Sequence, residues 1–334
     1  MSSSEGVSQL PAGLSLTGAA GTPEAKPVPS PTTVKVGLPA KTEPIAPLLL
    51  AHAEGEFEKE NLTVEYVSDT APNLLTLLGQ NKIDVVFGAP TALVLNAGKQ
   101  GVDLKWAAGL ASTWPDTGLY VNSKFGSNAA EFDPKKMKGA TIAVYPGGLT
   151  APVSYPIYQT LNEGGLTVDD VTITTIGDPA TMLQALKDGT VDGAILTPPQ
   201  SAAAANNNPF LVTPYPTDIS VGGYLVGSRL LAEDRAAGTA FFRALLRTTN
   251  TYLTGDYHAD TDVVAKLSEE MGVRPEMLTA SPSYEFSLDV LPNSVEAVQE
   301  MYREMAPDAL SYEGVTPQSE IVDLSLVIDA AEGR

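Results

Sequence analysis

The segment Tyr145-Pro-Gly-Gly-Leu-Thr-Ala-Pro152 carries the clearest signal for binding chemistry in this sequence. Gly147 and Gly148 allow the backbone to approach a ligand closely, and the hydroxyl of Thr150 can cap a helix that Pro152 would begin. The main-chain N–H groups around Leu149, together with the Thr150 hydroxyl, could therefore hold a small anion or a polar oxygen. The same residues also fit an ordinary turn followed by a helix cap.

Three aromatic residues, Trp114, Tyr145 and Tyr224, fall where strands are expected to end or where the chain crosses between them. Their rings could close over a flat or apolar part of a ligand. Core packing is the alternative for each of them.

A second group of candidates could bind charge. Lys41 lies beside Thr42 in the first loop after the first expected strand and is the best cationic candidate. A lysine that is simply exposed to solvent and binds no ligand would fit the same position. Glu43, Asp116 and Asp178 could accept an ammonium group, but each also suits a helix start or a turn.

The sequence contains no motif or set of residues that is typical of a catalytic site. It has no GxSxG, GxxxxGK[ST] or HExxH motif, no Cys and two His residues. His52 lies among Leu and Ala residues of an expected helix, and His258 lies in a polar segment. We therefore expect no enzyme activity, no cofactor and no metal centre.

The elements that must position the candidates alternate short β-rich runs with helical patterns, which is typical of mainly parallel sheets covered by helices. The expected strands are Val34–Leu38, Leu62–Val67, Asp84–Gly88, Leu104–Leu110, Thr141–Tyr145, Val171–Ile176, Val191–Leu196, Phe210–Thr213 and Tyr224–Gly227.

Ligands of such sheets lie beyond the carboxyl ends of the strands. The loops that follow the expected strands therefore add Ala89, Pro90 and Thr91 after one strand, and Thr197 and Pro198 after another, to the candidates.

The chain repeats one α/β unit. Val34 and Ile142 are 108 residues apart in similar short runs, and the same interval separates Asp84 from Asp192 in the runs Lys82–Pro90 and Thr190–Pro198. The two aspartates precede their strands, at the end remote from the expected ligand, so we assign them structural roles in the turn.

Two segments rich in turn formers, around 112–118 and 213–223, would carry the chain between the copies. We expect lobe one to comprise residues 34–112 and 222–330, lobe two residues 118–218, and a hinge residues 113–117 and 219–221. Two α/β lobes joined by two flexible crossovers would leave a cleft between them.

Composition limits the possible partners. The 334 residues include 40 acidic and 20 basic side chains, for a formal charge of -20. Such a chain repels phosphate backbones, so we expect no nucleic acid partner.

Residues 1–33 contain 15 Gly, Ser or Pro residues and no aromatic residue. A segment of this composition cannot bury enough apolar area to offset its ordering entropy, so we expect a disordered linker. It lacks the basic start and apolar stretch of a secretory signal.

Five segments resemble the solute-binding proteins of ABC importers in the nitrate/sulfonate/taurine group, also called NMT1/THI5-like or SsuA-like. They are Val34–Leu38, Ala51–Glu65, which looks like the family's run "A…GFFEKEGLDVE", Leu75–Pro90, Lys138–Tyr145 and Leu183–Pro199. The resemblance covers residues 34 to about 305.

The resemblance implies a two-lobed type II periplasmic-binding-protein fold, with two mixed, mainly parallel sheets flanked by helices and a hinge of two crossovers. It implies that the loop around Thr150 and the loops after the first and third strands hold a solute. Such proteins are exported and, in Gram-positive bacteria, lipid-anchored through an N-terminal Cys. We therefore expect an extracytoplasmic lipoprotein from which signal and anchor have been removed.

The expected function is capture of a small organic solute and its delivery to the membrane permease of an ABC importer, by a monomer. A small organic anion, such as a sulfonate, taurine, nitrate or a carboxylate, is the first expectation for the solute. An aromatic or heterocyclic molecule, such as a thiamine-precursor pyrimidine, is the alternative. An enzyme on the same fold and a non-transport sensor or scaffold are the alternatives from other classes.

Overall fold

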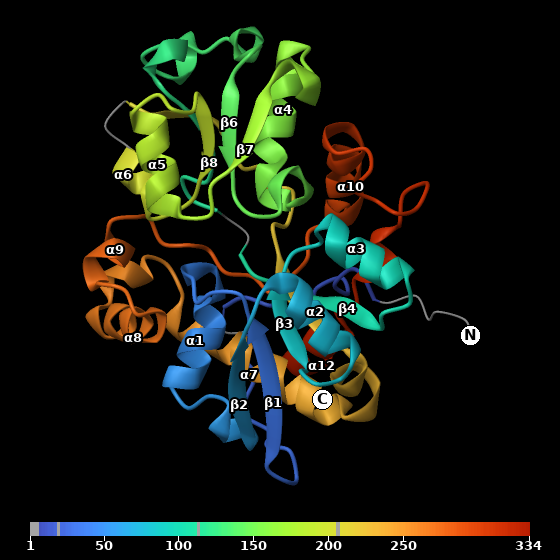
Figure 1. Cartoon of the computed structure of the whole chain (residues 1–334). Helices are drawn as coiled ribbons and strands as arrows, with labels where there is room; N and C mark the ends of the chain where they lie inside the picture. Colours follow the sequence, from blue (N-terminus) through green and yellow to red (C-terminus); the bar gives the residue numbers. More distant parts are fainter. Residues whose placement is uncertain (1–6, 19–20, 112–113, 205–207) are drawn as a thin grey trace.

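The computed structural model describes residues 7–18, 21–111, 114–204 and 208–334, which form two α/β lobes (Figure 1). Each lobe is built on a five-stranded sheet. The sheet of lobe one has the order β2-β1-β3-β10-β4, and its strands are β1 (Thr32–Leu38), β2 (Leu62–Ser68), β3 (Val85–Gly88), β4 (Leu104–Gly109) and β10 (Gly223–Gly227). The sheet of lobe two has the order β7-β6-β8-β5-β9, and its strands are β5 (Gly118–Val121), β6 (Thr141–Val144), β7 (Thr172–Thr175), β8 (Gly193–Leu196) and β9 (Phe210–Pro214).

Parallel pairing dominates one half of each sheet. In lobe one, β1 pairs in parallel with β2 and β3, and β10 lies antiparallel between β3 and β4. In lobe two, β6 pairs in parallel with β7 and β8, and β5 lies antiparallel between β8 and β9. The carboxyl ends of the parallel strands in both lobes therefore meet the gap between the lobes.

Helices cover the sheets. They are α1 (Ala46–Ala53), α2 (Ala71–Gly79), α3 (Ala92–Lys99), α4 (Tyr155–Gly164), α5 (Pro179–Lys187), α6 (Gln200–Ala204), α7 (Arg235–Tyr252), α8 (Thr261–Met271), α9 (Pro275–Thr279), α10 (Ser294–Met305), α11 (Gln318–Ile321) and α12 (Ser325–Ala331). One buried cluster joins strands β1 and β2 to α1, α7 and α12, and a second joins β3 and β4 to α2 and α3. Both faces of the first sheet are thus buried, as a parallel sheet requires. In the described ranges, no helix is both long and apolar enough to cross a membrane.

The nine expected strands are all present, with bounds that differ by at most two residues. The structure adds β5, a strand at the start of lobe two that the sequence analysis did not predict. β5 has four residues, Gly118-Leu-Tyr-Val121, and all of them are buried in the middle of the second sheet. A run this short, directly after a turn-rich segment, gives almost no periodic signal.

The two repeated aspartates occupy equivalent places. Asp84 donates its N–H to the Lys35 carbonyl at 2.9 Å, and its Oδ2 accepts the N–H of Lys35 at 2.8 Å. Asp192 accepts the N–H of Thr141 at 2.9 Å while its own N–H donates to the Thr141 carbonyl at 2.7 Å. Each carboxylate therefore ties the start of one strand to its neighbour, which is a structural role.

The amino-terminal segment differs from the expectation of a disordered linker. Within its described part, the side chains of Leu16 and Val28 are 4% and 7% exposed. The amide of Asn250 donates to the carbonyl of Leu16 at 3.0 Å and accepts the N–H of Gly18 at 2.8 Å, and Val28 donates its N–H to the carbonyl of Glu60 at 3.0 Å. The segment is ordered because apolar side chains such as Leu16 and Val28 are buried and because the Asn250 amide forms hydrogen bonds with its backbone. Its average composition is nevertheless typical of disorder.

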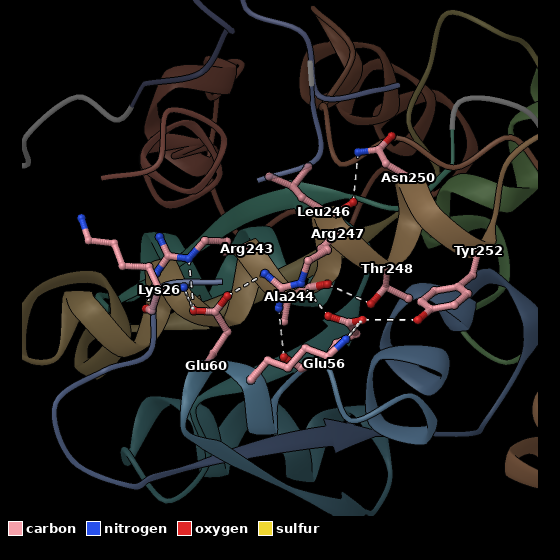
Figure 2. Close-up of polar contacts among 11 residues, drawn as sticks. Lys26, Glu56, Glu60, Arg243, Ala244, Leu246, Arg247, Thr248, Asn250 and Tyr252 are labelled. Carbon is pink, nitrogen blue, oxygen red and sulfur yellow. Dashed lines mark hydrogen bonds and ion pairs between the residues drawn. The ribbon is translucent and has the colours of Figure 1, made fainter. Parts of the chain in front are cut away.

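A buried ionic cluster fixes this segment to α7 (Figure 2). Glu60, with 0% exposure, accepts hydrogen bonds from Arg243 Nε at 3.1 Å and from an Arg247 guanidinium nitrogen at 2.8 Å. Arg247 also donates to Glu56 at 2.5 Å, and Arg243 donates to the carbonyl of Lys26 at 3.1 Å. Two carboxylates and two guanidiniums therefore balance one another where water is excluded.

The chain crosses between the lobes twice, between β4 and β5 and between β9 and β10. The two crossovers run together, and Tyr215 donates its N–H to the carbonyl of Thr117 at 2.8 Å. Lobe one also reaches lobe two through α10, which contacts α4 and lies beside it in Figure 1. The hydroxyl of Tyr158 on α4 donates to Glu304 of α10 at 3.3 Å.

Candidate functional site

A cavity of about 510 Å³ lies between the two lobes. Lobe one contributes the loop after β1, Phe87 at the end of β3, and the segment from the end of α8 to Tyr284. Lobe two contributes Tyr145 after β6, Pro179 after β7 and the residues that follow β8. The cavity therefore lies at the carboxyl ends of the strands of both sheets.

The structure brings seven of the sequence candidates together around this cavity. They are Lys41, Thr42, Glu43, Trp114, Tyr145, Thr197 and Pro198. All seven lie in loops or crossovers that directly follow strands, which is why their positions in the sequence pointed to one site.

Lys41 lies at the edge of the cavity with its charge already paired. Its Nζ donates to Glu270 Oε2 at 2.7 Å and lies 4.9 Å from the ring centre of Tyr66. The other oxygen of Glu270 is 2.9 Å from His52 Nδ1. Burial raises the pKa of Glu270, but the hydrogen bonds from Lys41 and His52 outweigh it, and the net effect is a lowered pKa.

Glu43 is buried behind the cavity, with 7% exposure. Its Oε1 lies 2.5 Å from His258 Nε2 and accepts the hydroxyl of Tyr257 at 2.5 Å. His258 Nδ1 lies 2.8 Å from the carbonyl of Ser281. Burial lowers the pKa of His258, but its hydrogen bond to Glu43 and the charge of that carboxylate together raise it above 6.5.

Aromatic rings form part of the cavity wall. Trp114 contacts Tyr284 edge-on, with ring centres 5.7 Å apart and planes at 88°. The hydroxyl of Tyr145 lies 3.4 Å from Thr197 Oγ1. The indole N–H of Trp114 is buried and has no hydrogen-bond partner among the described residues.

The structure places the Gly147–Thr150 loop outside the cavity. Gly148–Thr150 form a single turn of 3-10 helix in contact with α10, and none of these residues lines the cavity. Gly147 and Gly148 have φ values of 101° and 58°, which explains the two glycines. Thr150 Oγ1 donates to the carbonyl of Gly147 at 2.7 Å, so the hydroxyl closes the turn.

Five further candidates do not line the cavity. The hydroxyl of Thr91 caps α3 by accepting the N–H of Val94 at 3.3 Å, and Ala89 and Pro90 precede it in the same loop. Asp178 caps α5 by accepting the N–H of Thr181 at 2.8 Å. Asp116 is an exposed turn residue with φ of 51°.

Tyr224 is a correction to the sequence analysis. Its side chain is 0% exposed in the interior of lobe one, with its ring against Phe241 and Phe242 at centre distances of 6.3 and 6.0 Å. Tyr224 is the second residue of β10, and because its ring is covered by α7 it has no exposed surface with which to stack on a ligand.

Sequence reasoning missed most of the apolar lining. The missed residues are Pro44, Phe87, Val153, Pro179, Pro199, Gln200, Val221, Met271, Val273, Met277, Leu278 and Tyr284. Several of them adjoin strand-end loops that were already candidates. The group from 271 to 284 belongs to a segment that has no counterpart in the repeat, so no spacing rule pointed to it.

The described residues include no group of three or more His or acidic side chains that could hold a metal ion. Both histidines are engaged with carboxylates, His52 with Glu270 and His258 with Glu43.

A model of the NMT1-like family matches residues 28–210. The alkanesulfonate-binding protein SsuA from Xanthomonas axonopodis pv. citri, solved bound to MOPS, is 18% identical with a TM-score of 0.62 over 89% of this chain and 100% of that one. The periplasmic nitrate-binding protein NrtA from Synechocystis PCC 6803 is 15% identical, with a TM-score of 0.64 over 93% and 89%. A DSZB mutant in complex with biphenyl-2-sulfinic acid is 14% identical, with a TM-score of 0.61 over 91% and 100%.

No curated protein matches the chain. The structural likeness establishes the periplasmic-binding-protein fold, with two mixed sheets flanked by helices, in agreement with the fold that the sequence resemblance implied.

Proposed function

The chain belongs to the NMT1-like family, and from that premise we propose that it is an extracytoplasmic solute-binding protein that delivers a small organic solute to the permease of an ABC importer. The single observation that carries the proposal is the cavity of about 510 Å³ walled by loops of both lobes. A solute held there would contact both lobes at once and would stabilise their closed arrangement by its differential affinity. We propose residues 113–117 and 219–221 as the hinge, of which residue 113 lies outside the described residues.

The lining favours an aromatic or heterocyclic solute over a small hydrophilic anion. Phe87, Trp114, Tyr145 and Tyr284 supply ring surfaces, and most of the remaining lining is Pro, Val, Met or Leu. Walls of this kind bury apolar area and orient a ligand through a few polar groups. The bound MOPS and biphenyl-2-sulfinic acid of the similar structures support an organic acid as the second candidate.

We propose no catalysis. Glu43 and His258 could in principle exchange a proton, but His258 is held by a carboxylate on one side and a carbonyl on the other. A bound solute should therefore be recovered unchanged. Detection by mass spectrometry of a transformed product after incubation would favour an enzyme on this fold instead.

The test is a thermal-shift screen with pyrimidines, aromatic acids, sulfonates, carboxylates and nitrate. A solute at 100 times its dissociation constant should stabilise the protein by about 2.7 kcal/mol. Small-angle scattering with and without the solute would measure closure of the lobes. A solute that binds tightly without any change in scattering would argue against the transport mechanism.

A matched pair of variants locates the solute. Met277→Trp introduces a bulky neutral side chain into the cavity wall and should abolish binding, whereas Ala280→Trp, at the exposed position directly after α9, should leave it unchanged. Equal effects of the two substitutions would place the solute outside this cavity.

A further inference from the structure

The charged groups at the cavity form two pairs, each with one acid and one base. Lys41 is paired with Glu270 at 2.7 Å, and Glu43 is paired with His258 at 2.5 Å. Lys41 and Glu43 are the only lining residues with charged side chains in the described part of the chain. Neither therefore offers an uncompensated charge to a molecule in the cavity.

The other polar lining groups are neutral. Thr42, Thr197 and Gln200 carry hydroxyl or amide groups. Such groups can satisfy carbonyl, amide or ring-nitrogen functions of a ligand. They can orient a neutral molecule but supply little compensation for a full charge.

Charge placed in this cavity would thus lack a counter-charge. Moving an ion from water to an apolar site is costly unless it is paired, and an anion could recruit Lys41 only at the expense of Glu270. The surrounding Pro, Val, Met, Leu and aromatic side chains would exclude the water that could otherwise screen the ion.

Resting on the proposed solute-binding function, we infer that the solute of this cavity is a ring-containing molecule without net charge, oriented by hydrogen bonds to Thr42 and Thr197. The internal pairing of Lys41 with Glu270 is then the feature that discriminates against anionic solutes. This assignment separates the chain from the sulfonate and nitrate binders that share its fold.

Two fluorescent probes of the same ring skeleton test the inference directly. Anilinonaphthalene is uncharged, and anilinonaphthalene sulfonate carries one added negative charge. Each is titrated against the wild-type chain and against Met277→Trp, whose bulky neutral side chain fills part of the cavity without adding charge, and only the signal lost in that variant is counted as binding in the cavity. The uncharged probe should bind the wild-type cavity at least about tenfold more tightly than the sulfonate.

Releasing Lys41 should reverse this preference. Glu270→Gln leaves Lys41 without its carboxylate partner, and it should raise the affinity for the sulfonate probe about tenfold while changing that for the uncharged probe by less than about twofold. Glu269→Gln, at the exposed neighbouring position on α8, removes the same charge and should change neither affinity. Circular dichroism spectra of all variants confirm that they are folded.

Equal or tighter binding of the sulfonate by the wild-type cavity would overturn the inference and would leave solute binding itself in place. A Glu270→Gln variant with unchanged affinity for the sulfonate would overturn the role given to the ion pair. If neither probe enters the cavity, the site does not take ring-containing molecules and the inference fails. The proposed function is then decided separately, by the solute screen.

Discussion

Replacing Glu60 by Gln should destabilise lobe one strongly. The carboxylate is 0% exposed and accepts hydrogen bonds from Arg243, from Arg247 and from the main-chain N–H of Lys26 at 3.1, 2.8 and 3.2 Å. In Glu60→Gln one acceptor oxygen becomes an NH₂ donor that must face other donors, and the cluster keeps two guanidiniums with Glu56 as the one remaining buried carboxylate.

Breaking a buried ion pair by removing one partner costs about 3–5 kcal/mol. Glu56 still compensates Arg247, so we expect the lower end of that range, about 3 kcal/mol, for Glu60→Gln. Urea unfolding followed by circular dichroism would measure the change as a lower midpoint with an unchanged slope.

Glu58→Gln is the control, because Glu58 is exposed two positions earlier in the chain, and it should stay within about 0.5 kcal/mol of the wild type. A loss below about 1 kcal/mol for Glu60→Gln would refute the reasoning, since it would mean that the cluster is solvated and contributes as a surface ion pair does.

Leu16→Ala should lower the free energy of unfolding by about 2 kcal/mol in the same assay, whereas Val7→Ala, at a site 45% exposed, should have little effect. If Leu16→Ala left the stability unchanged, the amino-terminal segment would not be packed against lobe one. The contribution of the His258–Glu43 pair should be complete below pH 6.5 and should decline as the pH rises through the raised pKa of His258, because protonation favours the folded state. A His258→Asn variant should lose this decline, and an identical pH profile would contradict the assignment. Thr150→Ala should change the affinity for a solute by less than about twofold, because the Thr150 hydroxyl donates its hydrogen bond within its own turn. A tenfold loss of affinity in calorimetry would indicate that the solute binds at that loop after all.

The fold was largely predictable from the sequence, because strands buried on both faces are read as short apolar runs and the repeat marked equivalent positions in the two lobes. The runs that contain Asp84 and Asp192 identified the matching turns, and in the structure each aspartate accepts a main-chain N–H of the first strand of its repeat unit, from Lys35 and Thr141 respectively. β5 was not predicted because its four residues directly follow a turn-rich segment, which leaves no boundary or period to mark a strand.

The cavity was predictable only in part. The rule that ligands lie at the carboxyl ends of strands found Lys41, Trp114 and Thr197, since their place depends on chain order alone. It also selected Tyr224, because the sequence does not reveal that β10 runs inside the sheet and turns that ring toward the core. The Met277 region could not be found, since its position depends on how the carboxyl-terminal helices fold back.

The strand orders of the two sheets have a consequence for the origin of the chain. If the ten strands are divided into two successive sets of five, β5 of the first set completes the sheet of the second, and β10 of the second completes the sheet of the first. Each half thus lends its last strand to the other, as two identical subunits do in a domain-swapped dimer. The present chain has the topology of such a dimer after gene duplication and fusion. Severing it between β5 and β6 would therefore yield two fragments that each lack an internal strand of their sheet unless they reassociate.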